Sequence, residues 1–98
     1  MINGITISAP GFYGPQGRVL RLGLSMPEMN EKIESFQYKG QKITNFEMEC
    51  SAIYGLSKLL GHNALTICLI IANRVTRVAN NNYYPNMQNL IELILEKL

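Results

Sequence analysis

Residues 42–60, KITNFEMECSAIYGLSKLL, change from a strand pattern to a helix pattern partway along their length. The first part is rich in β-branched and aromatic residues and predicts a strand over 42–48. The second part repeats apolar residues at helical spacing and predicts a helix over 49–60, which Gly61 ends as the residue after the last turn. The segment therefore predicts a strand that passes directly into a helix, with Glu47-Met48-Glu49 at the junction.

The flanking segments continue this alternation of strands and helices. The run 65–72, LTICLIIA, carries no charge and is rich in β-branched residues, as in a central strand covered on both faces of a parallel sheet. The predicted elements are strands over 4–9, 19–24, 42–48 and 65–72 and helices over 27–39, 49–60 and 86–98, with Pro27 at the first position of the first helix and Asn86 as the cap of the last. This order predicts an α/β fold with helices on the faces of a sheet.

Length and composition limit the classes of protein to which the chain can belong. Its 98 residues allow one small domain, and 47% hydrophobic with 16% charged residues excludes a largely disordered chain. A net charge of +2 without a basic face argues against a nucleic-acid or membrane surface. With neither a signal sequence nor an apolar stretch of membrane length, the chain is expected to be cytoplasmic. Cys50 and Cys68 are expected to be reduced core residues, and no metal site is predicted.

The loop 10–18, PGFYGPQGR, carries the polar and aromatic groups that suit a flat ligand. Phe12 and Tyr13 offer ring surface for stacking, while Gln16 and Arg18 offer an amide beside a forked donor. A pyrimidine edge with an acceptor, a donor and an acceptor would suit that pair. The alternative is that the two polar residues form a solvated turn and the aromatics plug the core.

Glu49 lies at the junction between the predicted strand and the predicted helix. A carboxylate there can accept two hydrogen bonds from a vicinal diol such as that of ribose. The alternative is an acid at a helix N-terminus that interacts favourably with the helix dipole. One of Glu47 and Glu49 can face a ligand while the other is structural, so the pair does not indicate an acid and base dyad.

Three segments, PGFYGPQGR at 10–18, NFEMEC at 45–50 and IIANR at 70–74, resemble the carboxyl-terminal part of a uridine phosphorylase of the nucleoside phosphorylase superfamily. The resemblance runs nearly the full chain. It implies that residues 1–98 are the carboxyl-terminal portion of a nucleoside phosphorylase domain, and that their fold is a fragment of a three-layer α/β/α arrangement with a central mixed sheet. It also implies a homo-oligomer that binds uridine or a related pyrimidine nucleoside, with inorganic phosphate as co-substrate and no other cofactor.

The resemblance also assigns roles to individual residues. Gln16 would bond uracil O2 and N3 and Arg18 would donate to O4, and both would be catalytic because they stabilise charge on the base as the glycosidic bond breaks. Phe12 would pack on the base. The other substrate-binding residues implied are Met48 and Glu49 at the ribose, Ile71 and Ala72 beside the base, and Arg74 behind Gln16 and Arg18.

Departures from the family leave the activity of the chain itself open. Family members are longer, and the half with the Gly-rich phosphate loop would precede Met1, so we expect the chain alone to be inactive. The alternative is a truncated, non-catalytic α/β fragment that binds a nucleoside only weakly, or only a partner chain through an open sheet edge. Purine-specific members carry an Asp near Asn73 or Arg74, and the absence of Asp here favours pyrimidine nucleosides.

Overall fold

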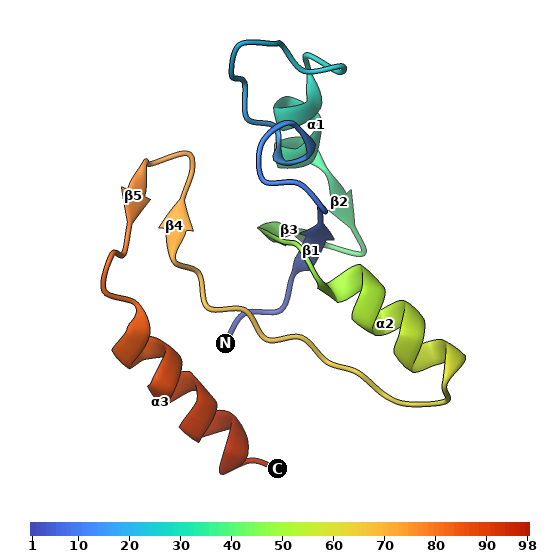
Figure 1. The fold of residues 1–98 in the computed structure, drawn as a ribbon, viewed down its shortest axis with the longest axis vertical. Coiled ribbons are helices and arrows are strands. Elements are labelled where there is room, and N and C mark those ends of the chain that lie inside the picture. The colour runs from blue at the N-terminus through green and yellow to red at the C-terminus, as the bar shows by residue number, and fades with distance from the viewer. The chain divides into compact units, whose positions relative to one another are not determined.

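The computed structural model describes all of residues 1–98 and divides into two compact units, Met1–Leu65 and Thr66–Leu98 (Figure 1). The first unit contains β1 (Ile5–Ser8), η1 (Gly14–Gln16), α1 (Met29–Ser35), β2 (Gln37–Tyr38), β3 (Gln41–Glu47) and α2 (Cys50–Leu59). The second unit contains β4 (Ala72–Asn73), β5 (Val78–Ala79) and α3 (Tyr84–Leu95).

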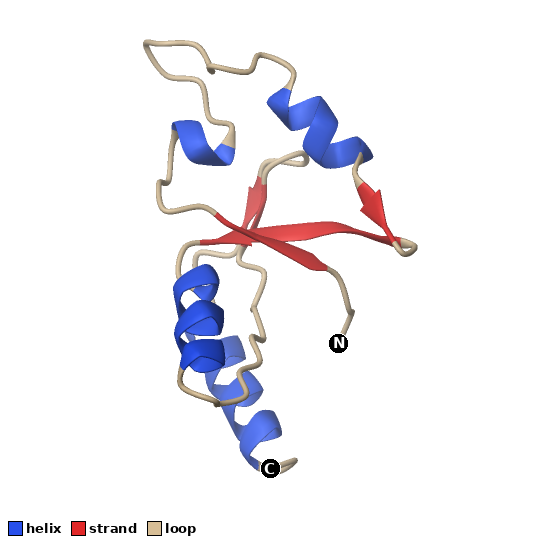
Figure 2. Cartoon of the chain, turned by 90° about the vertical axis from the view of Figure 1, so that its right-hand side faces the viewer, coloured by secondary structure: helices blue, strands red, loops and turns tan.

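The sheet of the first unit has the strand order β1-β3-β2 and mixes parallel with antiparallel pairing. β1 pairs in parallel with β3, and the pairing runs from Ile5 opposite Ile43 to Ser8 opposite Glu47, with an irregularity after Ile5. Figure 2 shows this pair, with α2 following the end of β3. The predicted α/β class with a mixed sheet is confirmed; the three-layer arrangement remains a prediction.

Three of the expected elements agree closely with the structure. The strands predicted over 4–9 and 42–48 are β1 and β3, and the helix predicted over 49–60 is α2. Gly61 follows α2 with a φ of +73°, which is the left-handed conformation expected after a helix end. The strand-to-helix junction at Glu47-Met48-Glu49 is therefore where the sequence pattern predicted it.

The predicted central strand over 65–72 is wrong in this structure. Residues 62–71 have no regular secondary structure, and only Ala72–Asn73 enters a strand, where it pairs with Val78–Ala79. A central strand of a parallel sheet needs hydrogen-bonded neighbours along both edges, whereas this run meets another strand only at its end, where Ala72 pairs with Ala79. High strand propensity alone therefore does not make this segment a strand.

Three further expectations need correction. The helix predicted over 27–39 is α1, which spans only Met29–Ser35, because β2 begins at Gln37. Residues 19–24 contain a bend at 20–22 and no strand, because no other strand pairs with them to accept their hydrogen bonds. The last helix begins at Tyr84, with Pro85 in its first turn, so Asn86 lies inside the helix and is not its cap. Proline is favoured in the first turn because the amide it lacks would have no helical partner there.

Few side chains are buried in either unit. The buried residues are Ala9, Gln16, Gly17 and Cys50, all in the first unit, and none lies in residues 66–98. Cys50 is buried as expected, whereas Cys68 is exposed, because the run in which it lies is not a strand inside a sheet. Helix α2 exposes the apolar side chains of Ile53, Leu56 and Leu59. No helix is both long enough and apolar enough to cross a membrane.

Candidate functional site

The loop after β1 turns back on itself through η1. The carbonyl oxygen of Tyr13 accepts hydrogen bonds from the backbone N–H groups of Gln16 and Arg18, at 3.1 and 3.0 Å. Gly17 has a φ of +73°, and a Cβ there would lie 2.1 Å from Oδ1 of Asn30. Asn30 in turn donates through Nδ2 to the Gly17 carbonyl over 2.9 Å. Helix α1 thus braces the loop at the one residue between Gln16 and Arg18.

This brace brings together three of the residues predicted to recognise the base. Arg18 Nη1 donates to Gln16 Oε1 over 2.7 Å and also to the carbonyl oxygen of Phe12. The Arg18 guanidinium carbon lies 3.8 Å from the centre of the Phe12 ring, a cation–π contact. Gln16 is 5% exposed and Arg18 is half-buried. The pair is therefore part of an ordered loop and not a solvated turn.

The bond between Arg18 and Gln16 also orders the polar atoms along this edge. A guanidinium carries only donors, so the Gln16 amide must turn its oxygen toward Arg18 and its Nε2 away. The order of groups becomes donor at Arg18, acceptor at Gln16 Oε1 and donor at Gln16 Nε2. The oxygen has a second lone pair, so it can accept another hydrogen bond while it holds Arg18.

Only one face of the Phe12 ring is open to a stacking ligand. The Arg18 guanidinium covers one face of its ring, and Tyr13 stands edge-on at 5.3 Å and 90°. Phe12 is still 52% exposed. A planar ligand could therefore pack on the opposite ring face or on the guanidinium, but not between Phe12 and Arg18.

The segment predicted to meet the ribose lies at the end of β3. Met48 and Glu49 are both exposed, and Glu49 is the residue immediately before α2. The Glu49 carboxylate makes no capping bond to its own helix. Glu47 instead caps α2, because its Oε2 accepts the backbone N–H groups of Glu49 and Cys50, each at 2.7 Å.

The carboxyl group of Glu47 is strongly stabilised in its ionised form. Burial raises its pKa, but contacts with the Cys50 side chain, the Glu49 backbone and the Ser8 side chain outweigh burial and lower the pKa from 4.5 to about 2. Oε1 is buried and has no hydrogen-bond partner, so Oε2 is the oxygen that accepts the two hydrogen bonds from backbone N–H groups. Glu47 is therefore a charged anchor for the start of α2.

Parallel pairing of β1 with β3 places the two segments at the same edge of the sheet. The backbone N–H of Ala9 donates to the Glu47 carbonyl over 2.9 Å, and the backbone N–H of Ser51 donates to Ser8 Oγ over 3.2 Å. The loop 10–18 and the segment 47–49 therefore start from one hydrogen-bonded junction; they are called the base loop and the ribose segment below, after the roles predicted for them. Ligands of open α/β sheets bind beyond this kind of edge, where the strands end.

The remaining predicted substrate-binding residues lie in the second unit. Ile71 is exposed just before β4, Ala72 belongs to β4, and Arg74 lies in the turn between β4 and β5. Oδ1 of Asn73 shapes that turn by accepting the backbone N–H groups of Val75 and Thr76, each at 3.0 Å. Support of Gln16 and Arg18 by Arg74, and a base pocket with Ile71 and Ala72, stay predictions.

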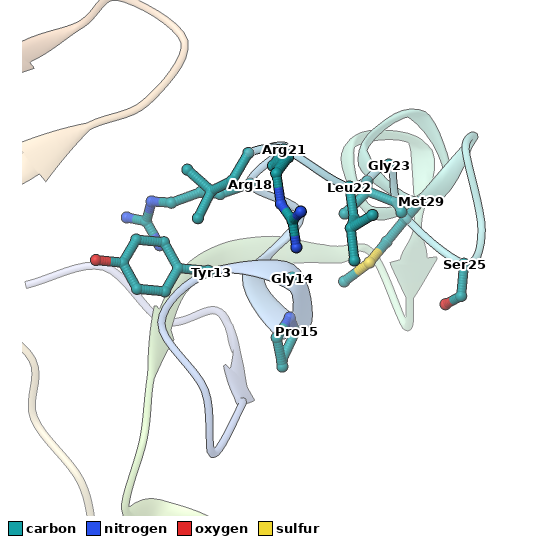
Figure 3. Close-up of a pocket in the computed structure, with 11 residues that line it drawn as sticks. Tyr13, Gly14, Pro15, Arg18, Arg21, Leu22, Gly23, Ser25 and Met29 are labelled. Atoms are coloured by element: carbon teal, nitrogen blue, oxygen red, sulfur yellow. The ribbon is translucent and has the colours of Figure 1, made fainter.

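The sequence reasoning did not anticipate a cavity of about 580 Å³ next to the base loop (Figure 3). Tyr13, Arg18 and Arg21 line it together with leucines of residues 20–24 and Met29 from α1. Its sequence signal was the cluster of leucines in 20–24, which was interpreted as a strand. No group of three or more His, Cys, Asp or Glu side chains is arranged to hold a metal ion.

Comparisons with known proteins bear on the family of this chain. No family model and no solved structure matches it. A uridine phosphorylase of Thermococcus kodakarensis is 37% identical to it over 79 residues, a match that covers 74% of this chain and 26% of the relative. The chain thus spans about a quarter of the length of this relative. The resemblance drawn from the sequence is confirmed: the chain is related to uridine phosphorylase over a segment of that enzyme.

Proposed function

We propose that this chain carries the base-recognition and ribose-recognition part of a uridine phosphorylase. In the complete enzyme a phosphate oxygen would bond to C1′ of uridine as the bond from C1′ to N1 breaks, giving ribose 1-phosphate and uracil. The electron pair of the broken bond spreads onto O2 and O4 of the leaving base before N1 takes up a proton from solvent. Donors aimed at those two oxygens lower the barrier for this step.

The observation that carries the proposal is the order of hydrogen-bonding groups at Arg18 and Gln16. Donor, acceptor and donor complement uracil, which presents O4 as acceptor, N3–H as donor and O2 as acceptor. Cytosine presents a donor amino group at position 4 and an acceptor at N3, so two of the three pairings fail. Mismatched polar groups that are left unpaired cost more than matched bonds contribute.

The ribose would be held at the adjacent segment. The Glu49 carboxylate is exposed at the end of β3 and has two oxygens with which to accept the 2′ and 3′ hydroxyl protons. Met48, which is 39% exposed, offers apolar surface beside it. Because β1 and β3 end together, one nucleoside could reach both segments.

Equilibrium binding of uridine and cytidine to the purified chain tests this proposal. We expect uridine to bind at least tenfold more tightly than cytidine, because two hydrogen bonds are lost and two groups are left unpaired. 5-Methyluridine, which keeps both the ribose and the base edge of uridine and adds only a methyl group, serves as the control and should bind like uridine. Equal affinity for uridine and cytidine would overturn the proposal.

A second candidate function is non-catalytic binding of a partner polypeptide. The exposed apolar face of α2 and the run over 62–71, which has no regular secondary structure, favour it, since exposed apolar surfaces are normally covered by further chain. Chemical cross-linking to partners in cells distinguishes the two candidates. A chain that is captured with a partner and binds no nucleoside would support this second function.

A further inference from the structure

The carboxylate of Glu47 holds the backbone on which the Glu49 side chain is carried. Its Oε2 holds the backbone N–H groups of Glu49 and Cys50 at 2.7 Å, which fixes the backbone on both sides of the Glu49 carbonyl. Bonds of amides to an ionised acceptor are stronger than those to a neutral one. The Glu49 side chain is exposed and makes no capping hydrogen bond, so Glu47, and not Glu49, caps the start of α2.

The same junction also connects Glu49 with the base loop. The Glu47 carbonyl accepts the N–H of Ala9, the residue just before that loop, over 2.9 Å. Ser8 stabilises the Glu47 charge through its side chain and accepts the N–H of Ser51 in α2 over 3.2 Å. A change at Glu47 therefore alters the placement of the ribose segment relative to the base loop, and not only the stability of the helix.

We propose that Glu47 is a positioning residue for sugar recognition, acting through Glu49 and holding it at a fixed place beside the base loop. This inference rests on the proposed function. Replacing the carboxylate by an amide of the same shape removes the charge that holds two N–H groups. The first turn of α2 then loosens, and the Glu49 carboxylate no longer meets both hydroxyls of the sugar.

The ratio of the affinities for uridine and 2′-deoxyuridine isolates this effect. A variant that only unfolds part of the protein lowers both apparent affinities equally, so the ratio stays unchanged. We expect Glu49→Gln to reduce the preference for uridine roughly tenfold, because a hydroxyl bond to a charged acceptor is lost. Glu47→Gln should reduce it by a similar factor. Glu34→Gln, which removes an exposed carboxylate from α1, is the matched control and should leave it unchanged.

The double variant Glu47→Gln with Glu49→Gln shows whether one residue acts through the other. Effects of coupled residues do not add, so we expect the double variant to show the same ratio as Glu49→Gln alone. A normal ratio in Glu47→Gln, or a further decrease in the double variant, would overturn the inference while uridine binding upholds the proposed function. Failure of the unaltered chain to bind either nucleoside would overturn the proposed function, and this inference with it.

Discussion

Nη1 of Arg18 donates to Oε1 of Gln16 over 2.7 Å, and this one bond fixes the direction in which the Gln16 amide faces. Gln16 is almost fully buried, so its amide cannot adjust freely to a different base. A preformed edge of this kind loses little conformational entropy on binding. Recognition of the base therefore depends on two residues that hold each other in place.

Removal of either partner should weaken uridine binding strongly. We expect Gln16→Ala and Arg18→Ala each to weaken it by at least tenfold, because each removes a ligand bond and also frees the remaining partner. Isothermal titration or an NMR titration measures the effect. Arg21→Ala removes a nearby arginine that lines the cavity but contacts neither Gln16 nor Phe12, and it should change the affinity by less than about twofold.

The stability of the chain should depend on pH through Glu47. Its pKa is lowered from 4.5 to about 2 in the folded chain, so its stabilising effect is complete above about pH 4.5 and disappears as the pH falls toward 2. Urea unfolding, followed by the helix signal at several pH values between 6 and 2, measures this loss. Glu47→Gln should be less stable at pH 6 and should lose less on acidification. An equal acid dependence in both proteins would contradict the assigned role of the carboxylate.

Two glycines, one inside α2 and one just after its end, should respond to alanine in opposite directions. Gly55 lies inside α2 with open space where a methyl group would be added, so Gly55→Ala should stabilise the helix by about 0.5–1 kcal/mol. Gly61 has a φ of +73°, so Gly61→Ala should destabilise by about 1 kcal/mol although no atom obstructs the methyl group. Unfolding midpoints of the two variants check this, and a shift of the same sign in both would contradict the assigned helix end.

The sequence predicted those elements whose stability is local. The strand and helix over 42–60 could be predicted because the periodicity changes within the segment and Gly61 marks the end. Pairing between distant segments could not be deduced in this way. The run over 65–72 has the composition of a strand but pairs with another strand only at Ala72, and the short strand β2 exists only because Lys39 and Gly40 turn the chain back onto β3.

The same division applies to the site. Gln16, Arg18 and Phe12 could be singled out because they lie in one short loop, but the contact of Arg18 with the Phe12 ring required the folded loop. The sequence allowed one of Glu47 and Glu49 to be structural, yet the two backbone N–H groups that Glu47 holds were not predicted, and the contact of Glu49 with a ligand stays a prediction. The cavity beside the loop was missed because it is formed by residues 20–24 in a non-strand conformation.

The isolated chain should associate with itself through its uncovered apolar segments. Ile70 is 57% exposed in a run without charge, so sedimentation at several concentrations should show association above the monomer mass. Ile70→Lys should reduce this association. Val75→Lys, at an 83% exposed site in the hairpin turn, is the matched control and should have less effect. A chain that stays monomeric at all concentrations and unfolds in one sharp two-state transition would contradict this prediction.

Residue-resolved NMR of the labelled chain during titration with uridine tests the central claim most directly. Recognition of both base and sugar predicts that the side-chain amide of Gln16 and the backbone amides of Arg18 and Glu49 shift together, with one dissociation constant. Cytidine at the same concentrations should leave the Gln16 amide unchanged. Uridine-induced shifts confined to α2 and α3, with Gln16 and Glu49 unaffected, would contradict the account.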